Sequence, residues 1–278
     1  MTPRDHELQR RSVLSGLVAG AALAVGACTS AGEDTQRSGA PATATPATRA
    51  TTGPDAPTAT GPSSATTSAG VPTVLLTSGP DIATGPATSS GVALTFHGAG
   101  DIATAHAVLD VLRARGARVT VFAVGTWLDT TPSLGREIVA AGHALGNHTW
   151  SHPVLTRLDL AAATDEVRRG ADAVAAAVGT PGLLFRPSGT PTSTATIRAA
   201  AAAAGYHRSI SYDVDSLDYT DPGADAVVAN VAAGVHPGAI VSLHLGHPGT
   251  LTALPRLLDL LATRRLRAVT VPELLGAV

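Results

Sequence analysis

Several residue types are scarce or missing in this chain of 278 residues. It contains no lysine, a single cysteine and only 3% aromatic residues, while 19 basic residues, all arginine, stand against 21 acidic ones. A net charge of −2 without any basic stripe argues against a nucleic-acid-binding protein. One cysteine cannot form an internal disulfide. With so few aromatic residues, we expect a core built of valine, leucine and alanine.

Residues 1–28 have the features of an export signal. The pair Arg10-Arg11 precedes an apolar run over residues 14–27, which is shorter than the roughly 20 residues that a membrane-spanning helix needs. This order is typical of a twin-arginine secretory signal. The small residues before Cys28 resemble a bacterial lipobox, so we expect lipidation of Cys28 and an anchor in the cell membrane. A plain cleaved signal with an unmodified cysteine is the alternative.

Residues 29–72 consist almost entirely of alanine, threonine, proline, glycine and serine. Such a segment cannot bury enough apolar surface to offset its ordering entropy, and its prolines favour an extended coil. We interpret it as a disordered linker that leads to a single domain over residues 73–278. The length of this second part, about 205 residues, is enough for one domain with a full core.

Short apolar segments alternate with helical periods throughout the expected domain. Strictly alternating strands and helices indicate an α/β fold with a parallel sheet, either a barrel or an open doubly wound sheet. The strands are expected at residues 91–96, 119–124, 183–185, 210–214, 240–244 and 268–271, and residues 144–145 form a further strand-like segment. The helices are expected at residues 103–115, 132–141, 159–178, 194–204, 225–233 and 251–262.

Polar side chains gather where the expected strands end. The clusters are residues 97–101, 147–152, 186–187, 213–218 and His244. In a barrel, catalytic side chains collect at the carboxyl ends of the strands. Each of these residues alone is explained by ordinary hydrogen bonding in a loop. Their joint placement at five strand ends indicates one site.

Within the second cluster, His148 and His152 have the spacing of a metal-ligand pair. One helical turn or tight loop can direct both imidazoles at one point. Neutral imidazole suits Zn²⁺ and its neighbours, and a third ligand must then come from another part of the chain. Because H-x-x-x-H is a weak pattern by itself, a pair of loop histidines without an ion is the alternative.

From about residue 92 to residue 275 the chain resembles the polysaccharide deacetylases, the NodB-homology or carbohydrate esterase family 4 group. The family's H-[ST]-x-x-H motif appears at residues 148–152, and its Arg-x-Pro region appears at residues 185–187. The D-[SA]-x-D-W motif appears at residues 215–219, and the last motif ends in His244. The resemblance implies a single distorted (β/α) barrel and the metal-dependent removal of acetyl groups from sugars.

The resemblance also assigns roles to residues of the site. His148 and His152 bind a divalent metal, and Zn²⁺ is our first expectation. His244, as imidazolium, protonates the leaving amine. Asp218 orients His244, and Arg186 positions a carboxylate near the base.

Three further residues are expected to face the sugar. Ser188 follows the Arg-x-Pro region, where the family has a backbone N–H that holds the oxyanion, and a backbone donor does not depend on the side chain. Tyr219 replaces the tryptophan of the fourth motif and keeps an aromatic face for stacking. Trp150, inside the second motif, is the third substrate-binding candidate.

The first motif departs from the family pattern T-F-D-D-G, in which the first aspartate is the base and the second binds the metal. This chain reads T-F-H-G-A-G-D over residues 95–101, so His97 takes the place of the base, and Gly98, which offers no ligand, that of the second aspartate. We predict that Asp101 reaches back over the glycine turn as the third metal ligand. A third imidazole from His97 and an inactive site are the alternatives. His97 and Asp101 are the two candidates for the base.

We therefore predict an exported, metal-dependent hydrolase that removes N-acetyl groups, or O-acetyl groups, from a cell-envelope polysaccharide such as peptidoglycan or a chitin-like glycan. A catalytically inactive relative that binds glycans is the main alternative, and a hydrolase of a non-sugar amide is another. We expect a monomer that meets the membrane only through a lipid anchor at Cys28, with no nucleic-acid partner.

Overall fold

The structure, a computed structural model, describes residues 70–276. The expected signal at residues 1–28, with Cys28, and nearly all of the expected linker lie outside the described residues. Within residues 70–276, no helix has the length and apolar character needed to cross a bilayer. The first described element is a 3-10 turn, η1 (Thr73–Leu76), which precedes the first strand.

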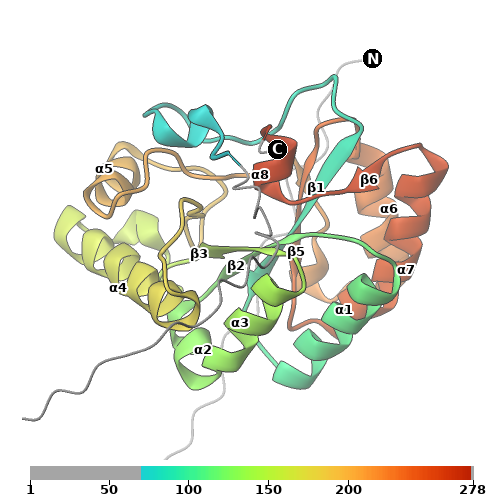
Figure 1. The fold of residues 1–278 in the computed structure, drawn as a ribbon, viewed down its shortest axis with the longest axis horizontal. Coiled ribbons are helices and arrows are strands. Elements are labelled where there is room, and N and C mark those ends of the chain that lie inside the picture. Colours follow the sequence, from blue (N-terminus) through green and yellow to red (C-terminus); the bar gives the residue numbers. More distant parts are fainter. Residues whose placement is uncertain (1–69, 277–278) are drawn as a thin grey trace, which may run out of the picture. The chain divides into compact units, whose positions relative to one another are not determined.

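Parallel strands form the centre of the domain (Figure 1). The strands are β1 (Gly91–Gly98), β2 (Thr120–Ala123), β3 (Ala144–Asn147), β4 (Val214–Asp215), β5 (Ile240–His244) and β6 (Arg267–Ala268). β1 lies in the middle, between β2 and β5, while β3 lies beyond β2 and β4 lies beyond β5. β6 pairs with the first residues of β1. All of these ladders are parallel, as the alternation of strands and helices predicts.

Single parallel bridges close the sheet into a distorted barrel. Asn147 at the end of β3 bridges Phe185, and Phe185 bridges Ser209. From Ser209 the chain runs into β4, which pairs with β5 on the far side of the sheet. The expected strands at residues 183–185 and 210–214 are therefore present only as bridges and a two-residue ladder. Beside β5, the Asp213 carboxylate accepts the N–H of Ile240, which interrupts the regular backbone pairing.

Helices lie outside the barrel (Figure 1). They are α1 (Ile102–Ala114), α2 (Gly125–Thr130), α3 (Pro132–Ala140), α4 (Leu160–Val178), α5 (Ala195–Ala203), α6 (Ala224–Gly234), α7 (Pro248–Thr263) and α8 (Val271–Leu274). The six predicted helices are confirmed, whereas α2 and α8 were not predicted. The last predicted strand is corrected, because Thr270 and Glu273 form a capping box that starts α8 where the strand was expected to end.

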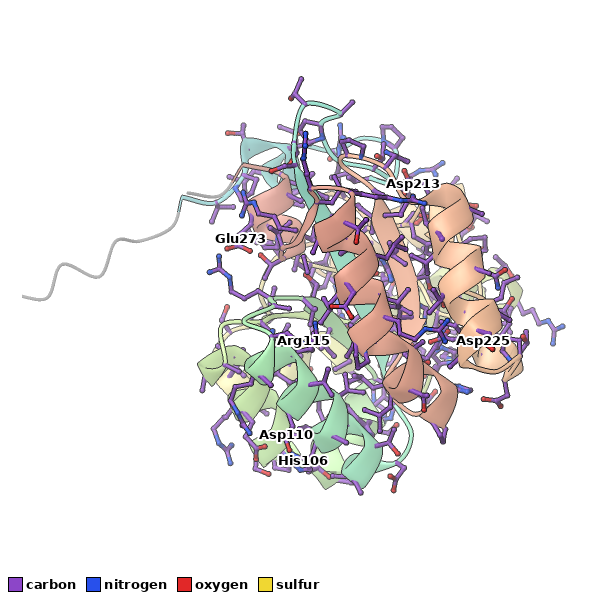
Figure 2. The ribbon with its side chains drawn as sticks, turned by 90° about the vertical axis from the view of Figure 1, so that its right-hand side faces the viewer. His106, Asp110, Arg115, Asp213, Asp225 and Glu273 are labelled. Carbon is purple, nitrogen blue, oxygen red and sulfur yellow. The ribbon has the colours of Figure 1, made fainter. Side chains whose placement is uncertain are left out.

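The core has the composition that the scarcity of aromatic residues predicts. Between the sheet and its outer helices, the buried side chains are nearly all valine, leucine and alanine. Inside the barrel, Phe122 packs with Ile210 and Ile240. On the surface, an Arg115–Asp259 ion pair links α1 to α7, and an Arg256–Asp225 ion pair links α7 to α6 (Figure 2). Exposed pairs of this kind contribute little to stability, so packing holds the helices in place.

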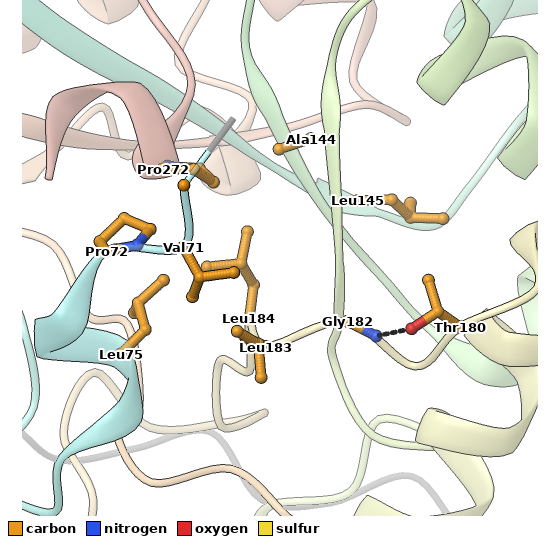
Figure 3. A pocket seen from close by; sticks show the side chains of 11 residues that line it. Val71, Pro72, Leu75, Ala144, Leu145, Thr180, Gly182, Leu183, Leu184 and Pro272 are labelled. Atoms are coloured by element: carbon orange, nitrogen blue, oxygen red, sulfur yellow. Dashed lines mark hydrogen bonds between the residues drawn. The ribbon is translucent and has the colours of Figure 1, made fainter. Parts of the chain in front are cut away.

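The amino end of β3 borders an apolar cavity of about 480 Å³ (Figure 3). Its walls come from the segment around η1, from β3, from the loop before Phe185 and from the start of α8. The large side chains that line it are Val71, Pro72, Leu75, Leu145, Leu183, Leu184 and Pro272. Within residues 70–276, no ionisable side chain lines this cavity. The polar clusters expected from the sequence lie at the other end of the strands.

Candidate metal and catalytic site

The ends of β1, β5 and β3 bring the predicted histidines together, with β2 between β1 and β3. His97 is the last residue but one of β1 and pairs in register with His244, the last residue of β5. His148 directly follows β3. The ring centroid of His97 lies 4.4 Å from that of His148 and 4.3 Å from that of His244. These side chains therefore share the carboxyl rim of the barrel, where the fold places catalytic groups.

The imidazoles of His97, His148 and His152 form a cluster that can hold a metal ion. One ligand nitrogen from each of the three residues lies within 4.8 Å of the others. A tight loop joins the two later histidines, since Thr149 and His152 have positive φ values of 67° and 59°. Asn147 holds this loop because its side-chain oxygen accepts the N–H of Thr149 at 2.8 Å. The loop, and not a helical turn, sets the H-x-x-x-H geometry.

His148 shows most directly that this cluster fits a metal. Its ring is fully buried, and Nδ1 lies 2.9 Å from the carbonyl oxygen of Arg186. Nδ1 therefore carries the proton, and the lone pair is on Nε2. That buried Nε2 has no hydrogen-bond partner among the described residues. A histidine oriented by a backbone carbonyl with its other nitrogen unpaired is the usual arrangement of a metal ligand, and three imidazoles with an open fourth position suit a catalytic divalent ion.

The three imidazoles are held in their neutral form. Burial, followed by the charges of His148 and Arg186, lowers the pKa of His97 well below its usual range. Burial also lowers the pKa of His148 strongly, and it lowers the pKa of His152 to a smaller extent. Neutral imidazole is the form that binds metals, so a metal entering near neutral pH displaces no proton from these rings.

Asp101 does not join this cluster, and its predicted role is corrected. Its exposed carboxylate caps the amino end of α1 and accepts the backbone N–H and the hydroxyl of Thr104, at 2.7 and 2.8 Å. The bonds from Thr104 hold the pKa of Asp101 below its usual range. The carboxylate is thus used as a helix cap, and the residue that lies beside the two other histidines is His97.

Gly98 occupies a position where a side chain would meet packed atoms. A Cβ at Gly98 would lie 2.9 Å from Val121 Cγ1, 3.0 Å from Ala123 Cα and 3.0 Å from a ring carbon of Trp127. The same indole donates its N–H to the carbonyl of Gly100 at 3.1 Å, which holds the turn after β1. Because side chains alternate along a strand, position 98 faces away from the histidine cluster and into the outer core.

Arg186 lies buried beside the cluster, and its hydrogen bonds go to neutral groups. Nη1 donates to the hydroxyl of Thr95 at 2.8 Å and contacts Nε2 of His97 at 3.3 Å. The other bonds go to the backbone carbonyls of Ile210 and Ser211. Burial lowers the pKa of Arg186 to about 9. The predicted role was to position a carboxylate, but among the described residues the guanidinium is directed at the His97 ring instead.

His244 and Asp218 form the predicted acid–carboxylate pair. Asp218 begins a 3-10 turn, η3 (Asp218–Thr220), and its two oxygens lie 2.7 Å from Nδ1 and from the backbone N of His244. The hydroxyl of Thr250, which the sequence analysis did not single out, donates to the same carboxylate. Burial alone would raise the pKa of Asp218, but the bonds from His244 and Thr250 outweigh it and hold that pKa below its usual range. The pair leaves Nε2 of His244 available to a substrate.

An open cleft of about 290 Å³ lies over these groups. It is lined by His97, His152, Pro187, Gly189, Thr190, Pro191, Tyr212, Tyr219, Ser242 and His244. Tyr219 is 50% exposed, and its ring centroid lies 5.5 Å from that of His244. An exposed aromatic ring beside the acid has the position expected for a sugar-stacking face.

The side chains of Ser188 and Trp150 do not line the cleft, and the backbone N–H predicted at Ser188 stays a prediction. The Ser188 hydroxyl is buried and donates to the carbonyl of Pro153 at 2.6 Å. The Trp150 ring packs beneath Arg169 of α4, whose guanidinium carbon lies 4.4 Å from the ring centroid. Tyr212 lines the cleft and was missed, although it lies in the expected strand at residues 210–214, so the strand-end rule could have identified it.

Comparison with known proteins defines the family. The polysaccharide deacetylase profile matches residues 84–209. The chain is 32% identical over 188 residues to a peptidoglycan-N-acetylglucosamine deacetylase of Bacillus cereus, and the match covers 66% of this chain and 87% of that protein. It is 39% identical over 143 residues to a chitooligosaccharide deacetylase of a Bradyrhizobium species, covering 51% of this chain and 64% of that protein, which is less than two thirds of its length. The chain belongs to the polysaccharide deacetylase family.

A solved structure supports the same fold. The crystal structure of a Bacillus anthracis protein, described as a pseudoenzyme of carbohydrate esterase family 4, has a TM-score of 0.66 and 25% sequence identity to this chain. The match covers 71% of this chain and 69% of that one. The predicted distorted barrel is confirmed, and a member of the family without activity also adopts it.

Proposed function

We propose that this protein is a deacetylase that hydrolyses acetamido groups of a cell-envelope glycan outside the cytoplasm. His97, His148 and His152 hold a divalent metal, with Zn²⁺ the first candidate. The observation that carries the proposal is the buried Nε2 of His148, which lacks a partner within a cluster of three neutral imidazoles. The deacetylase names of the relatives support the reaction class, and the expected signal at residues 1–28 supports the location.

The residues around the cluster have separate roles in amide hydrolysis. A bound divalent metal supplies Lewis acidity toward the acetyl carbonyl and makes a water more acidic. His244, as imidazolium, donates its Nε2 proton to the leaving nitrogen, and Asp218 keeps Nδ1 in the tautomer that this requires. Tyr219 stacks on the sugar. The backbone after Pro187 lines the cleft and supplies the position from which an N–H can stabilise the oxyanion.

The test is metal content together with acetate release, measured on the purified full chain. We expect one equivalent of metal after reconstitution with Zn²⁺, and acetate release from N-acetylglucosamine oligomers or from peptidoglycan. His148→Ala and His97→Ala should weaken metal binding by at least about 100-fold. Asp101→Ala is the matched control and should keep the metal, since the carboxylate caps α1.

Each other result selects a different function. If His97→Ala keeps its metal and loses only activity, His97 is the base and not a ligand. If the wild-type chain takes up neither Zn²⁺ nor Co²⁺, Ni²⁺ or Mn²⁺, the second candidate applies, a glycan-binding protein without activity. The replaced T-F-D-D-G motif and the pseudoenzyme neighbour favour that second candidate. Binding of N-acetylglucosamine oligomers without acetate release would establish it.

A further inference from the structure

A second histidine–carboxylate pair lies beside the first one. Nδ1 of His247 lies 2.7 Å from Oδ1 of Asp221, as Nδ1 of His244 lies 2.7 Å from Oδ1 of Asp218. The two histidines lie three positions apart, at the end of β5 and just after it. The two carboxylates are also three positions apart, at the first residue of η3 and at the residue that follows η3. One short segment therefore offers a carboxylate to each ring.

The backbone of that segment is bent in an unusual way. Leu217 and Asp221, which flank η3, have positive φ values of 55° and 51°. Non-glycine residues in this conformation cost energy and are found where the surrounding structure requires them, often at functional sites. The N–H of Asp221 donates to the carbonyl of Asp218, which ties the two acidic residues together. The bend places the Asp221 carboxylate on His247.

Exposure rises across the two pairs, from the buried Asp218 carboxylate to the exposed Asp221 carboxylate. The His244 and His247 rings have centroids 5.7 Å apart and an interplanar angle of 76°. Side-chain exposure is 0% for Asp218 and 21% for His244, against 28% for His247 and 67% for Asp221. The ionisable groups that contact His247 are His244 and Asp221. Rings at this separation are within reach of one bridging water.

We propose that His247, positioned by Asp221, relays protons between solvent and His244. The inference rests on the proposed function, in which His244 loses its Nε2 proton to the leaving nitrogen in every turnover. In the relay, an N–H bond of His247 breaks and an N–H bond forms at Nε2 of His244, directly or through one water. His247 then takes a proton from a buffer acid in solvent. These proton transfers need no other reactant and involve no change of oxidation state.

The kinetic test uses His247→Ala, whose backbone carbonyl can still accept the N–H groups of Thr250 and Leu251 at the start of α7. At low buffer concentration we expect kcat to fall about tenfold, within the range of a single proton-transfer contribution. KM and the metal content should stay at their wild-type values. Added imidazole should restore kcat of this variant in a saturable way. Asp221→Asn should give a smaller loss in the same direction.

Two controls separate a relay from a structural effect. His236→Ala removes a comparable surface pair, in which Nε2 of His236 lies 2.9 Å from Asp213, and it should change neither kcat nor its buffer dependence. His244→Ala removes the acid itself, so imidazole at the relay position cannot restore it. If kcat of His247→Ala falls without any imidazole rescue, or does not fall at low buffer, the relay is wrong.

A measurement without turnover keeps this test independent of the proposed function. In the metal-free chain, ¹⁵N NMR reports how fast the ring proton of His244 exchanges with water. We expect slower exchange in His247→Ala than in the wild type and in His236→Ala. Equal exchange in all three proteins would overturn the relay. An inactive wild-type chain that still shows slowed exchange in His247→Ala would overturn the proposed deacetylase and leave the proton path standing.

Discussion

The two halves of the cleft differ in how their charged groups are paired. In the acid half, from β5 and η3, the Asp218 carboxylate receives hydrogen bonds from His244 and Thr250 and is fully paired. In the metal half, from β1 and the loop after β3, the proposed ligands are neutral rings. The charged group next to them, Arg186, makes its hydrogen bonds to neutral acceptors among the described residues.

This difference shows which half the altered first motif has changed. A buried cation without an anion is costly, and the cost is lowered when a negative group enters its surroundings. The T-F-D-D-G pattern of the family would supply two carboxylates to this half, whereas T-F-H-G supplies none. The acid half keeps the aspartate and the histidine of the family motifs at Asp218 and His244, with Tyr219 in place of tryptophan. The two halves should therefore respond separately to substitution.

The largest effect is expected from Asp218→Asn in the acid half. An amide cannot replace the carboxylate that orients and charge-stabilises His244, so kcat/KM should fall by about 10³-fold. The metal content should stay at one equivalent, since the metal half is unchanged. Metal analysis beside acetate release would check this. The control is Asp213→Asn, which alters the surface pair with His236 and keeps an oxygen for the Ile240 N–H. Loss of metal in Asp218→Asn would show that the halves are coupled.

Gly98→Asp tests whether the metal half can regain a carboxylate ligand. The new side chain meets Val121, Ala123 and Trp127, so we expect a loss of about 1–3 kcal/mol in the free energy of unfolding from overpacking. Zinc affinity should not rise, because this position faces away from the histidines. Urea unfolding and zinc titration measure both quantities. Gly249→Ala, where a Cβ meets no atom closer than 4.0 Å, is the control. Tighter zinc binding in Gly98→Asp would contradict this account.

The elements that could be predicted are those whose local pattern and tertiary environment agree. The strand at Ile240–His244 was predicted with its observed bounds, because a buried, mostly apolar run ends there in a histidine. The segments at residues 183–185 and 210–214 were also predicted as strands, but they pair through single bridges and a two-residue ladder where the barrel closes. Their short pairing depends on Asp213 taking the Ile240 N–H, a contact between distant parts of the chain.

The residue types of the site and the strand ends that carry them could be predicted from the sequence. The direction in which each side chain points could not. The sequence analysis placed His97 and Asp101 on the same turn and selected Asp101 as the third ligand. Asp101 precedes Thr104 by three residues, which is the spacing between a helix N-cap residue and the backbone N–H that it accepts. This hydrogen bond from Thr104 determines the direction of the Asp101 side chain. Thr250 was missed because its contact with Asp218 spans 32 residues and leaves no short motif.

In the metal-free chain, the pH dependence of stability should distinguish the metal half from the acid half. The unfolded-state pKa of histidine is about 6.5 and the folded-state pKa of His97 and His148 is lower, so their contribution is complete above pH 6.5. It is lost as the pH falls from there through the lowered folded values. Asp218, whose pKa is also lowered, loses its contribution only below about pH 4. Thermal unfolding from pH 8 to 5 should show a shallower fall in His148→Asn; an unchanged slope would contradict this.

The smallest effect is expected from Thr250→Val, which keeps the shape of a buried side chain and removes one of the bonds to Asp218. A single hydrogen bond to a charged group is worth about 1.5–3 kcal/mol when buried, but the backbone and ring of His244 still hold this carboxylate, so a loss of about 1 kcal/mol in unfolding free energy is expected. In kinetics we expect a fall in kcat of about fivefold, with KM and metal content unchanged. Thr252→Val, whose exposed hydroxyl bonds the carbonyl of Pro248 in the same helix, is the control. A loss as large as that of Asp218→Asn would mean that Thr250, and not the carboxylate alone, orients His244 for proton donation.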